Sequence, residues 1–197
     1  MRLPFALLAG IALCGGCFTS SKPTPKSWTV EPPAASSQAV APEGGTPAFA
    51  TTRVGTIAVN APFDRTSFVV RRADGSVAFD AYNEFAASPS ALLRAPVKSQ
   101  LAADGRFGHV VAPSSVANAD ASVEVLVTDL SLDCRDSGKR MARAAVSVDV
   151  VKTGRGARTV ALSADGASEA DAASGDFSTA FSTAFNAALA EALRLLK

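Results

Sequence analysis

The alternation of apolar and polar residues predicts a β-sheet in the second half of the chain. Apolar residues recur at every second position in three runs, namely Val123, Val125 and Val127; Val146, Val148 and Val150; and Val160 with Leu162. Successive side chains of a strand point to opposite faces of the sheet, so this period of two indicates strands with one buried face. The connecting segments 134–139 and 153–156 are too short for crossover helices, which favours an antiparallel meander.

Further β-prone runs precede these. Residues 53–59 form one, ended by Asn60-Ala61-Pro62, and residues 68–72 and 76–80 flank Ala73-Asp74-Gly75. Glycine accepts the positive φ that tight turns need, so Asp-Gly between two such runs is a strong hairpin signal.

A longer period predicts a helix between residues 88 and 103. Ser88 is a suitable N-cap, Pro89 suits the first turn, and Asp104-Gly105 is a typical end. Its apolar stripe consists of Leu93, Val97 and Leu101. Pro96 removes the hydrogen bond to the Leu92 carbonyl, so we expect a kink.

A second helix is predicted over residues 174–196. Its apolar residues lie four apart and consist of Phe177, Phe181, Phe185, Leu189 and Leu193. We interpret this stripe as packing against the sheet; the alternative is a groove for lipid or a partner. The patterns together predict an α+β fold, with a mostly antiparallel or mixed sheet of about five to six strands and two helices packed on it.

The amino-terminal residues resemble the signal of a bacterial lipoprotein. Arg2 precedes an apolar run over residues 3–13, which is shorter than the ~20 residues that a membrane-spanning helix needs. Leu13-Cys14-Gly15-Gly16-Cys17 then resembles a lipobox. We therefore predict a signal peptide over residues 1–16 and lipidation of Cys17, with palmitate as an expected acyl chain. The alternative is an ordinary secretory signal that merely contains cysteines.

Lipidation would hold the protein stably at a membrane. Phe18 follows Cys17 where an aspartate would act as an inner-membrane retention signal, so the usual sorting rule favours the periplasmic face of the outer membrane. Cys14 leaves with the signal and Cys17 is acylated, so no intramolecular disulfide is expected. We interpret the remaining Cys134 as a half-buried residue at a strand end and not as a nucleophile.

Residues 17–50 are predicted to be the lipidated terminus and a disordered tether, because they hold six of the chain's 11 prolines among Ser, Thr and Gly. The exception is Ser27-Trp28-Thr29-Val30, a β-prone stretch with the only tryptophan. It could add an edge strand or form an exposed loop, and we favour the strand. Residues 51–197 are long enough for one domain with its own core.

Charge and motifs argue against several functions. The chain has 19 Lys and Arg and 18 Asp and Glu, and loss of Arg2 with the signal leaves both at 18, which gives no support to a nucleic-acid partner. His109 is the only histidine and lacks partners for a metal site. No serine lies in a Gly-x-Ser-x-Gly motif. We therefore expect a protein without catalytic residues, cofactor or metal, and hence not an enzyme.

One region carries a specific resemblance, which extends more weakly over nearly the whole chain. Its motifs are Phe63-Asp64-Arg65, Val69-Val70-Arg71-Arg72, Gly75-x-Val77, Tyr82-x-x-Phe85-Ala86, Ser88-Pro89 and Leu92-Leu93. They are similar to those of the ABC-type transport auxiliary lipoprotein family, to which we assign residues 51–197. Phe85 stands where the family usually has tryptophan, and Pro96 interrupts a helix that is usually continuous.

The resemblance implies a docking component of an MCE-type ABC lipid transport system, in which an MCE-domain protein would form a periplasmic conduit between the membranes. A ring-like homo-oligomer would suit a tubular partner. We place a docking face around Arg71, Arg72, Tyr82 and Phe85, because Arg and Tyr are enriched at interface hot spots. Alternatively, Tyr82 and Phe85 pack the hairpin onto the first helix. The rival functions are a lipoprotein that activates an envelope enzyme, such as a peptidoglycan synthase, and a periplasmic hydrolase.

Overall fold

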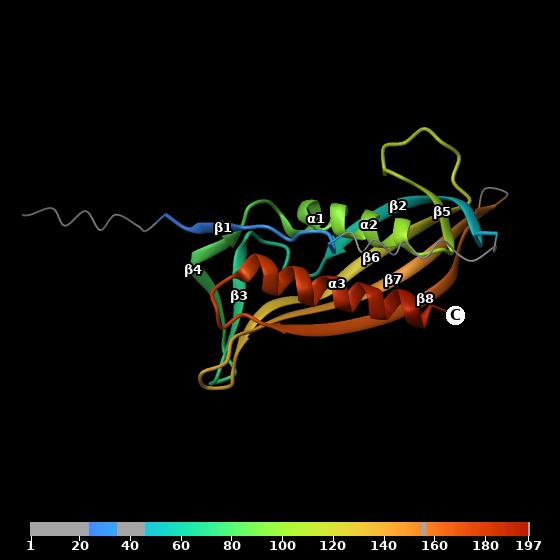
Figure 1. Ribbon diagram of the computed structural model, residues 1–197. Coiled ribbons are helices and arrows are strands. Elements are labelled where there is room, and N and C mark those ends of the chain that lie inside the picture. Colours follow the sequence, from blue (N-terminus) through green and yellow to red (C-terminus); the bar gives the residue numbers. More distant parts are fainter. Residues whose placement is uncertain (1–23, 35–45, 155–156, 197) are drawn as a thin grey trace, which may run out of the picture.

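The computed structural model describes residues 24–34, 46–154 and 157–196, which form one large mixed sheet with helices on one side (Figure 1). The strands and helices follow in the order β1 (Lys26–Trp28), β2 (Phe49–Val59), β3 (Ser67–Arg72), β4 (Val77–Phe85), α1 (Pro89–Leu92), α2 (Arg94–Ala103), β5 (Phe107–Val111), β6 (Ala121–Cys134), β7 (Met141–Gly154), β8 (Ala157–Asp171) and α3 (Phe177–Leu195). The α+β class is as predicted. The predicted signal peptide and Cys17 lie outside the described residues, and none of the described helices has the length and apolar content that crossing a membrane requires.

The sheet has eight strands in the described part of the chain, not five to six, and its pairing is only partly antiparallel. On one side of β6, β7 and then β8 pair antiparallel. On the other side, β2 and β3 both pair with β6 in parallel. β5 and β1 add further parallel pairs to β2 and β4. The meander predicted for the three valine-rich strands is therefore confirmed in β6, β7 and β8, whereas the parallel pairs join strands that are not consecutive in the chain, which short loops do not determine.

A change of register in β6 lets one strand serve two partners. β2 pairs with residues 121–127 of β6 and β3 with residues 131–134. Between them, the pairing with β7 shifts at Val127 and Asp129, as in a β-bulge. The shift also moves the buried face from Val127 to Leu130. A bulge adds local twist, so the β2 and β3 branches diverge from a common strand.

The predicted hairpin and helices are confirmed. Gly75 has φ +82 between β3 and β4. The predicted first helix is divided at Leu93 into α1 and α2, three residues before Pro96, in agreement with the expected interruption. At the start of α3, the Asp176 side chain accepts a hydrogen bond from the Thr179 N–H at 3.1 Å.

The core lies between the sheet and α3, which crosses β7 and β8. Phe68 is fully buried, and its ring centroid lies 4.6 Å from that of Phe85 and 4.9 Å from that of Phe181. Gly166 of β8 lies directly under the helix, since a Cβ at this position would be 2.1 Å from the Ala188 carbonyl oxygen. The backbone of α3 can approach the sheet this closely only because residue 166 has no side chain.

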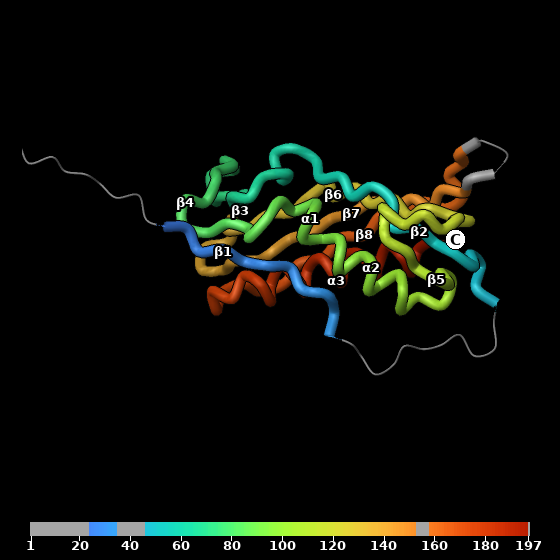
Figure 2. The backbone as a smooth tube through the Cα atoms, turned by 90° about the horizontal axis from the view of Figure 1, so that it is seen from above, coloured from blue at the N-terminus to red at the C-terminus, as the bar shows by residue number. Residues whose placement is uncertain are grey.

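The stretch around Trp28 is the predicted edge strand, and it continues along α3 (Figure 2). The Trp28 indole N–H donates to Asn83 Oδ1 at 3.0 Å, and its ring makes an edge contact with Phe177. Further along, the Glu31 N–H donates to Ser182 Oγ at 2.8 Å. Residues 26–34, part of the predicted tether, thus form a strap that packs on the folded domain.

Candidate functional site

One face of the sheet carries no helix in the described part of the chain. Because α2, α3 and the strap all lie on the opposite side (Figure 2), the alternate side chains of the long strands face outward. We call this the uncovered face. Its residues are Arg71, Glu124, Leu126, Asp129, Asp133, Arg143, Ala145, Ser147, Asp149, Asp165, Ala167 and Glu169. Ser131 lies on the same side of β6 but is fully buried.

Arg71, one of the predicted docking residues, belongs to this face. Its Nη2 lies 2.9 Å from Asp129 Oδ2, and its Nε donates to Ser131 Oγ at 3.1 Å. The Ser131 hydroxyl in turn donates to Asp129 at 2.7 Å. These contacts hold the guanidinium over the junction of β3 and β6 while 31 % of the Arg71 side chain stays exposed.

The other predicted docking residues do not gather beside Arg71. Arg72 is exposed at the end of β3, and Tyr82 is exposed in β4. Phe85 is only 2 % exposed and lies on the opposite side of the sheet, where its ring is 5.0 Å from that of Phe181. Phe85 therefore packs the hairpin onto α3. The alternative prediction, that Phe85 packs the hairpin onto a helix, is right about packing, but the helix is α3 and not the first helix.

Two exposed apolar side chains beside Arg71 were missed. Val77 pairs with Arg71 and Phe79 with Val69, so both lie on the uncovered side of β4. They are 50 % and 48 % exposed, and the Arg65 guanidinium lies 4.0 Å from the Phe79 ring centroid. The alternation of Val77 and Phe79 was visible in the sequence. It could not show which face of the hairpin a helix would cover.

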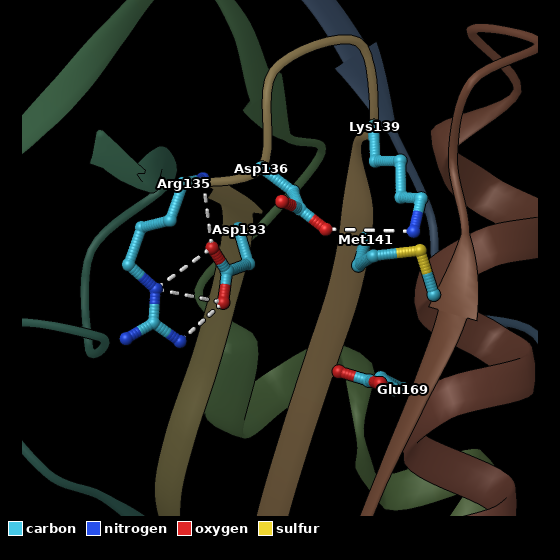
Figure 3. Close-up of a pocket in the computed structure, with 6 residues that line it drawn as sticks. All are labelled: Asp133, Arg135, Asp136, Lys139, Met141 and Glu169. Carbon is cyan, nitrogen blue, oxygen red and sulfur yellow. Dashed lines mark hydrogen bonds and ion pairs between the residues drawn. The ribbon is translucent and has the colours of Figure 1, made fainter. Parts of the chain in front are cut away.

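At the β6–β7 turn, an open pocket of ≈ 430 Å³ is lined by charged groups (Figure 3). We call it the hairpin-end pocket. Asp133 pairs with Arg135 at 2.6 Å and with Arg143 at 2.8 Å, and Asp136 pairs with Lys139 at 3.4 Å. Arg143 also lies 3.7 Å from Glu169. Every acid that lines this pocket thus has a basic partner.

The same contacts set the protonation state of Asp133. The hydrogen bonds from Arg135, joined by that from Arg143, hold the pKa of Asp133 well below its ordinary value. A carboxylate fixed in its charged form and fully paired is suited to holding a turn in place and not to accepting a proton. Nor do the described residues contain a group of three His, Cys, Asp or Glu that could hold a metal ion.

Cys134 and His109 lie apart from these clusters. Cys134 is half-buried at the end of β6, as predicted, and burial raises the pKa of its thiol. A raised pKa lowers the fraction of reactive thiolate. His109 is exposed on β5, the predicted strand.

Comparison with known proteins agrees with the resemblance read from the motifs. A family described as "ABC-type transport auxiliary lipoprotein component" matches residues 33–194. The chain belongs to this family. The auxiliary lipoprotein is therefore a component associated with ABC-type transport, and the family description implies an envelope location with a membrane anchor.

One solved structure supports the fold. The auxiliary lipoprotein is similar to protein XCC0632 of Xanthomonas campestris, which belongs to the family DUF330, with a TM-score of 0.56, 16% identity and 85% of each chain covered. A second structure, of an uncharacterized protein, has a TM-score of 0.46 and 14% identity, covering 61% of this chain and 72% of that one. The search of curated proteins gave no match.

Proposed function

We propose that this auxiliary lipoprotein is the docking component of an MCE-type ABC lipid transport system, anchored through Cys17 at the periplasmic face of the outer membrane. The observation that carries the proposal is the family match over residues 33–194, which spans nearly all of the described fold. The partner would be the MCE-domain protein that links the two membranes. The proposal gives the chain an adaptor's role, without catalysis.

The uncovered face supports a docking role because it offers the features of an interface centre. Arg71, Val77 and Phe79 form a patch on which exposed apolar side chains adjoin a guanidinium that is already positioned. Interface hot spots are enriched in aromatic residues and arginine, surrounded by polar groups. We call these three residues the docking patch. The docking patch retains Arg71 from the sequence-based prediction. It does not include Phe85, because that side chain is buried.

The strap changes what the anchor can reach. Only eight residues separate Cys17 from Lys26, where β1 begins. Even a fully extended chain of this length spans no more than roughly 30 Å. While the strap stays on the domain, the start of β1 therefore stays within that distance of Cys17. A short reach suits a receptor that receives the tip of a conduit at the outer membrane.

Affinity purification of the full-length lipoprotein from membranes tests the proposal. We expect an MCE-domain protein to co-purify with the wild type and to be lost with Phe79→Asp, which places a charge in the docking patch. Leu195→Ala is the matched control, because Leu195 is a 39 % exposed apolar residue on α3 and lies outside the docking patch. Recovery of a peptidoglycan synthase without an MCE-domain protein would instead support the rival activator function.

A further inference from the structure

A groove of ≈ 570 Å³ lies at the far end of β6 from the hairpin-end pocket. Arginines from three separate elements line it: Arg53 of β2, Arg94 at the start of α2 and Arg158 of β8. Glu124 is the one acidic residue among its lining residues. We call this the arginine groove. Its lining carries three positive charges and one negative charge. In the hairpin-end pocket, by contrast, every acid is paired with a basic side chain.

The partners of these arginines leave two charges without a counter-ion in the described part of the chain. Arg158 forms an ion pair with Glu124. Arg53 Nη2 donates to the carbonyl oxygens of Ser115 and Ala117 at 3.2 and 2.6 Å, but these acceptors are neutral. Arg94 has no hydrogen-bond or ion-pair partner among the described residues. The arginine groove is thus an electropositive hollow in a chain of nearly neutral composition.

Arg53 is positioned in advance of any ligand. The loop after β5 supplies both carbonyl oxygens, so the guanidinium is fixed against the wall of the groove. Its Nε is buried and has no hydrogen-bond partner, which is uncommon for a buried polar atom. Positioning a cation and leaving it without a counter-ion costs stability, and an anion would offset this cost.

We propose that the arginine groove binds a phosphate ester. Guanidinium groups match phosphate oxygens in geometry and charge, and the hydroxyls of Thr56 and Ser122 in the lining can donate further hydrogen bonds. The volume falls in the range of small-molecule sites, which exceeds what a bare phosphate fills. Ile57 and Pro113 provide apolar contacts for the rest of the molecule. Lipid headgroups and soluble esters share this chemistry.

Titration of the full-length lipoprotein in uncharged detergent micelles tests the site. The probes are glycerol 3-phosphate, short-chain phosphatidylglycerol and inorganic phosphate, with binding followed by calorimetry. We expect the wild type to bind at least one of the two esters more tightly than inorganic phosphate, and Arg94→Ala to weaken this binding about ten-fold. Arg72→Ala, which removes an exposed arginine of the hairpin, should leave it unchanged.

The outcomes separate the sources of the ester. Binding of phosphatidylglycerol alone assigns a lipid headgroup, and binding of glycerol 3-phosphate with equal affinity assigns a soluble ester; both support the site. Binding of neither ester overturns the proposal, as does equal weakening by Arg94→Ala and Arg72→Ala. Binding of a poly-glutamate peptide in place of the esters would also overturn it, in favour of an acidic protein segment. Because Arg94 is exposed, circular dichroism should show Arg94→Ala folded.

Discussion

The hairpin-end pocket and the arginine groove, at opposite ends of β6, carry similar kinds of residue but use them differently. At the hairpin end, Asp133, Asp136 and Glu169 each pair with a basic side chain. In the arginine groove, only one of three arginines pairs with a carboxylate in the described part of the chain. The first end satisfies its own charges, whereas the second keeps a positive charge available to a ligand.

The comparison shows that the balance of charge within a cluster indicates function better than the presence of charged residues. The net charge of +1 for the whole chain conceals the difference, because a small acidic excess outside the arginine groove offsets part of its positive charge. Pairing within the hairpin end stabilises a turn. Arg53 also holds the loop after β5 through two carbonyl oxygens, but neither acceptor neutralises its charge. We therefore assign ligand binding to the arginine groove and stabilisation of a turn to the hairpin end.

The largest effect should come from disturbing the sheet on which both ends depend. Gly166→Ala would place a Cβ 2.1 Å from the Ala188 carbonyl oxygen and 2.6 Å from the Ala192 nitrogen, so α3 must move outward. We expect a loss of about 3 kcal/mol in the free energy of unfolding, measured by urea denaturation. Ala167→Val, on the exposed side of the same strand, is the control. Equal urea midpoints for the two variants would show that α3 does not pack closely on Gly166.

The hairpin end should lose stability when Asp133 loses its charge. Asp133→Asn weakens the ion pairs with Arg135 and Arg143, and the Asp133 side chain is only 12 % exposed, so we expect a loss of about 1 kcal/mol at pH 7. Asp136→Asn, whose carboxylate is 79 % exposed, should cost no more than about 0.5 kcal/mol. An equal loss of stability for both variants would contradict the claim that the ion pairs of Asp133 stabilise the β6–β7 turn.

The effect of Asp133→Asn should also depend on pH. The pKa of Asp133 is lower in the folded state than in the unfolded state, so its stabilising contribution is fully present above the unfolded value of about 3.9. The contribution is lost as the pH falls from there towards the folded pKa. The difference between wild type and Asp133→Asn should therefore shrink below about pH 4. A difference that stays constant from pH 7 to pH 3 would argue against the ion pairs as its cause.

The smallest effect should appear at the other end, where removing an acid should improve binding. Glu124→Gln deletes the carboxylate that pairs with Arg158, so we expect tighter binding of a phosphate ester by about three-fold. Calorimetry on the full-length protein measures it. Asp165→Asn, an exposed acid elsewhere on the uncovered face, serves as the control. Weaker binding by Glu124→Gln would mean that the ion pair positions Arg158 for the ligand.

Local patterns predicted the local elements. Asp74-Gly75 marked the hairpin and the four-residue spacing of Phe177, Phe181 and Phe185 marked α3, because both depend on neighbouring residues. The parallel pairing of β2 and β3 with β6 was not predictable in this way. It depends on segments far apart in sequence and on a bulge between Val127 and Asp129 that no propensity signals.

The candidate site was predictable only in part for the same reason. A motif singled out Arg71, whose role in docking stays a prediction. Val77 and Phe79 were not placed on the docking face, because the covered side of the hairpin is decided by α3. The arginine groove has no sequence signature, since Arg53, Arg94 and Arg158 meet only through the fold. The motif at Phe85 was compatible with a packing role as well as with a docking role, and the burial of Phe85 favours packing in this fold.

Site-specific photo-crosslinking in living cells tests the central claim, that the uncovered face docks an MCE-domain protein, most directly. A photoreactive amino acid would replace Phe79 in the docking patch and, in a matched variant, Leu195 on α3. We predict a crosslink from position 79 to an MCE-domain protein and none from position 195. A crosslink to that protein from position 195 alone, or a crosslink from position 79 only to a cell-wall synthase, would contradict it.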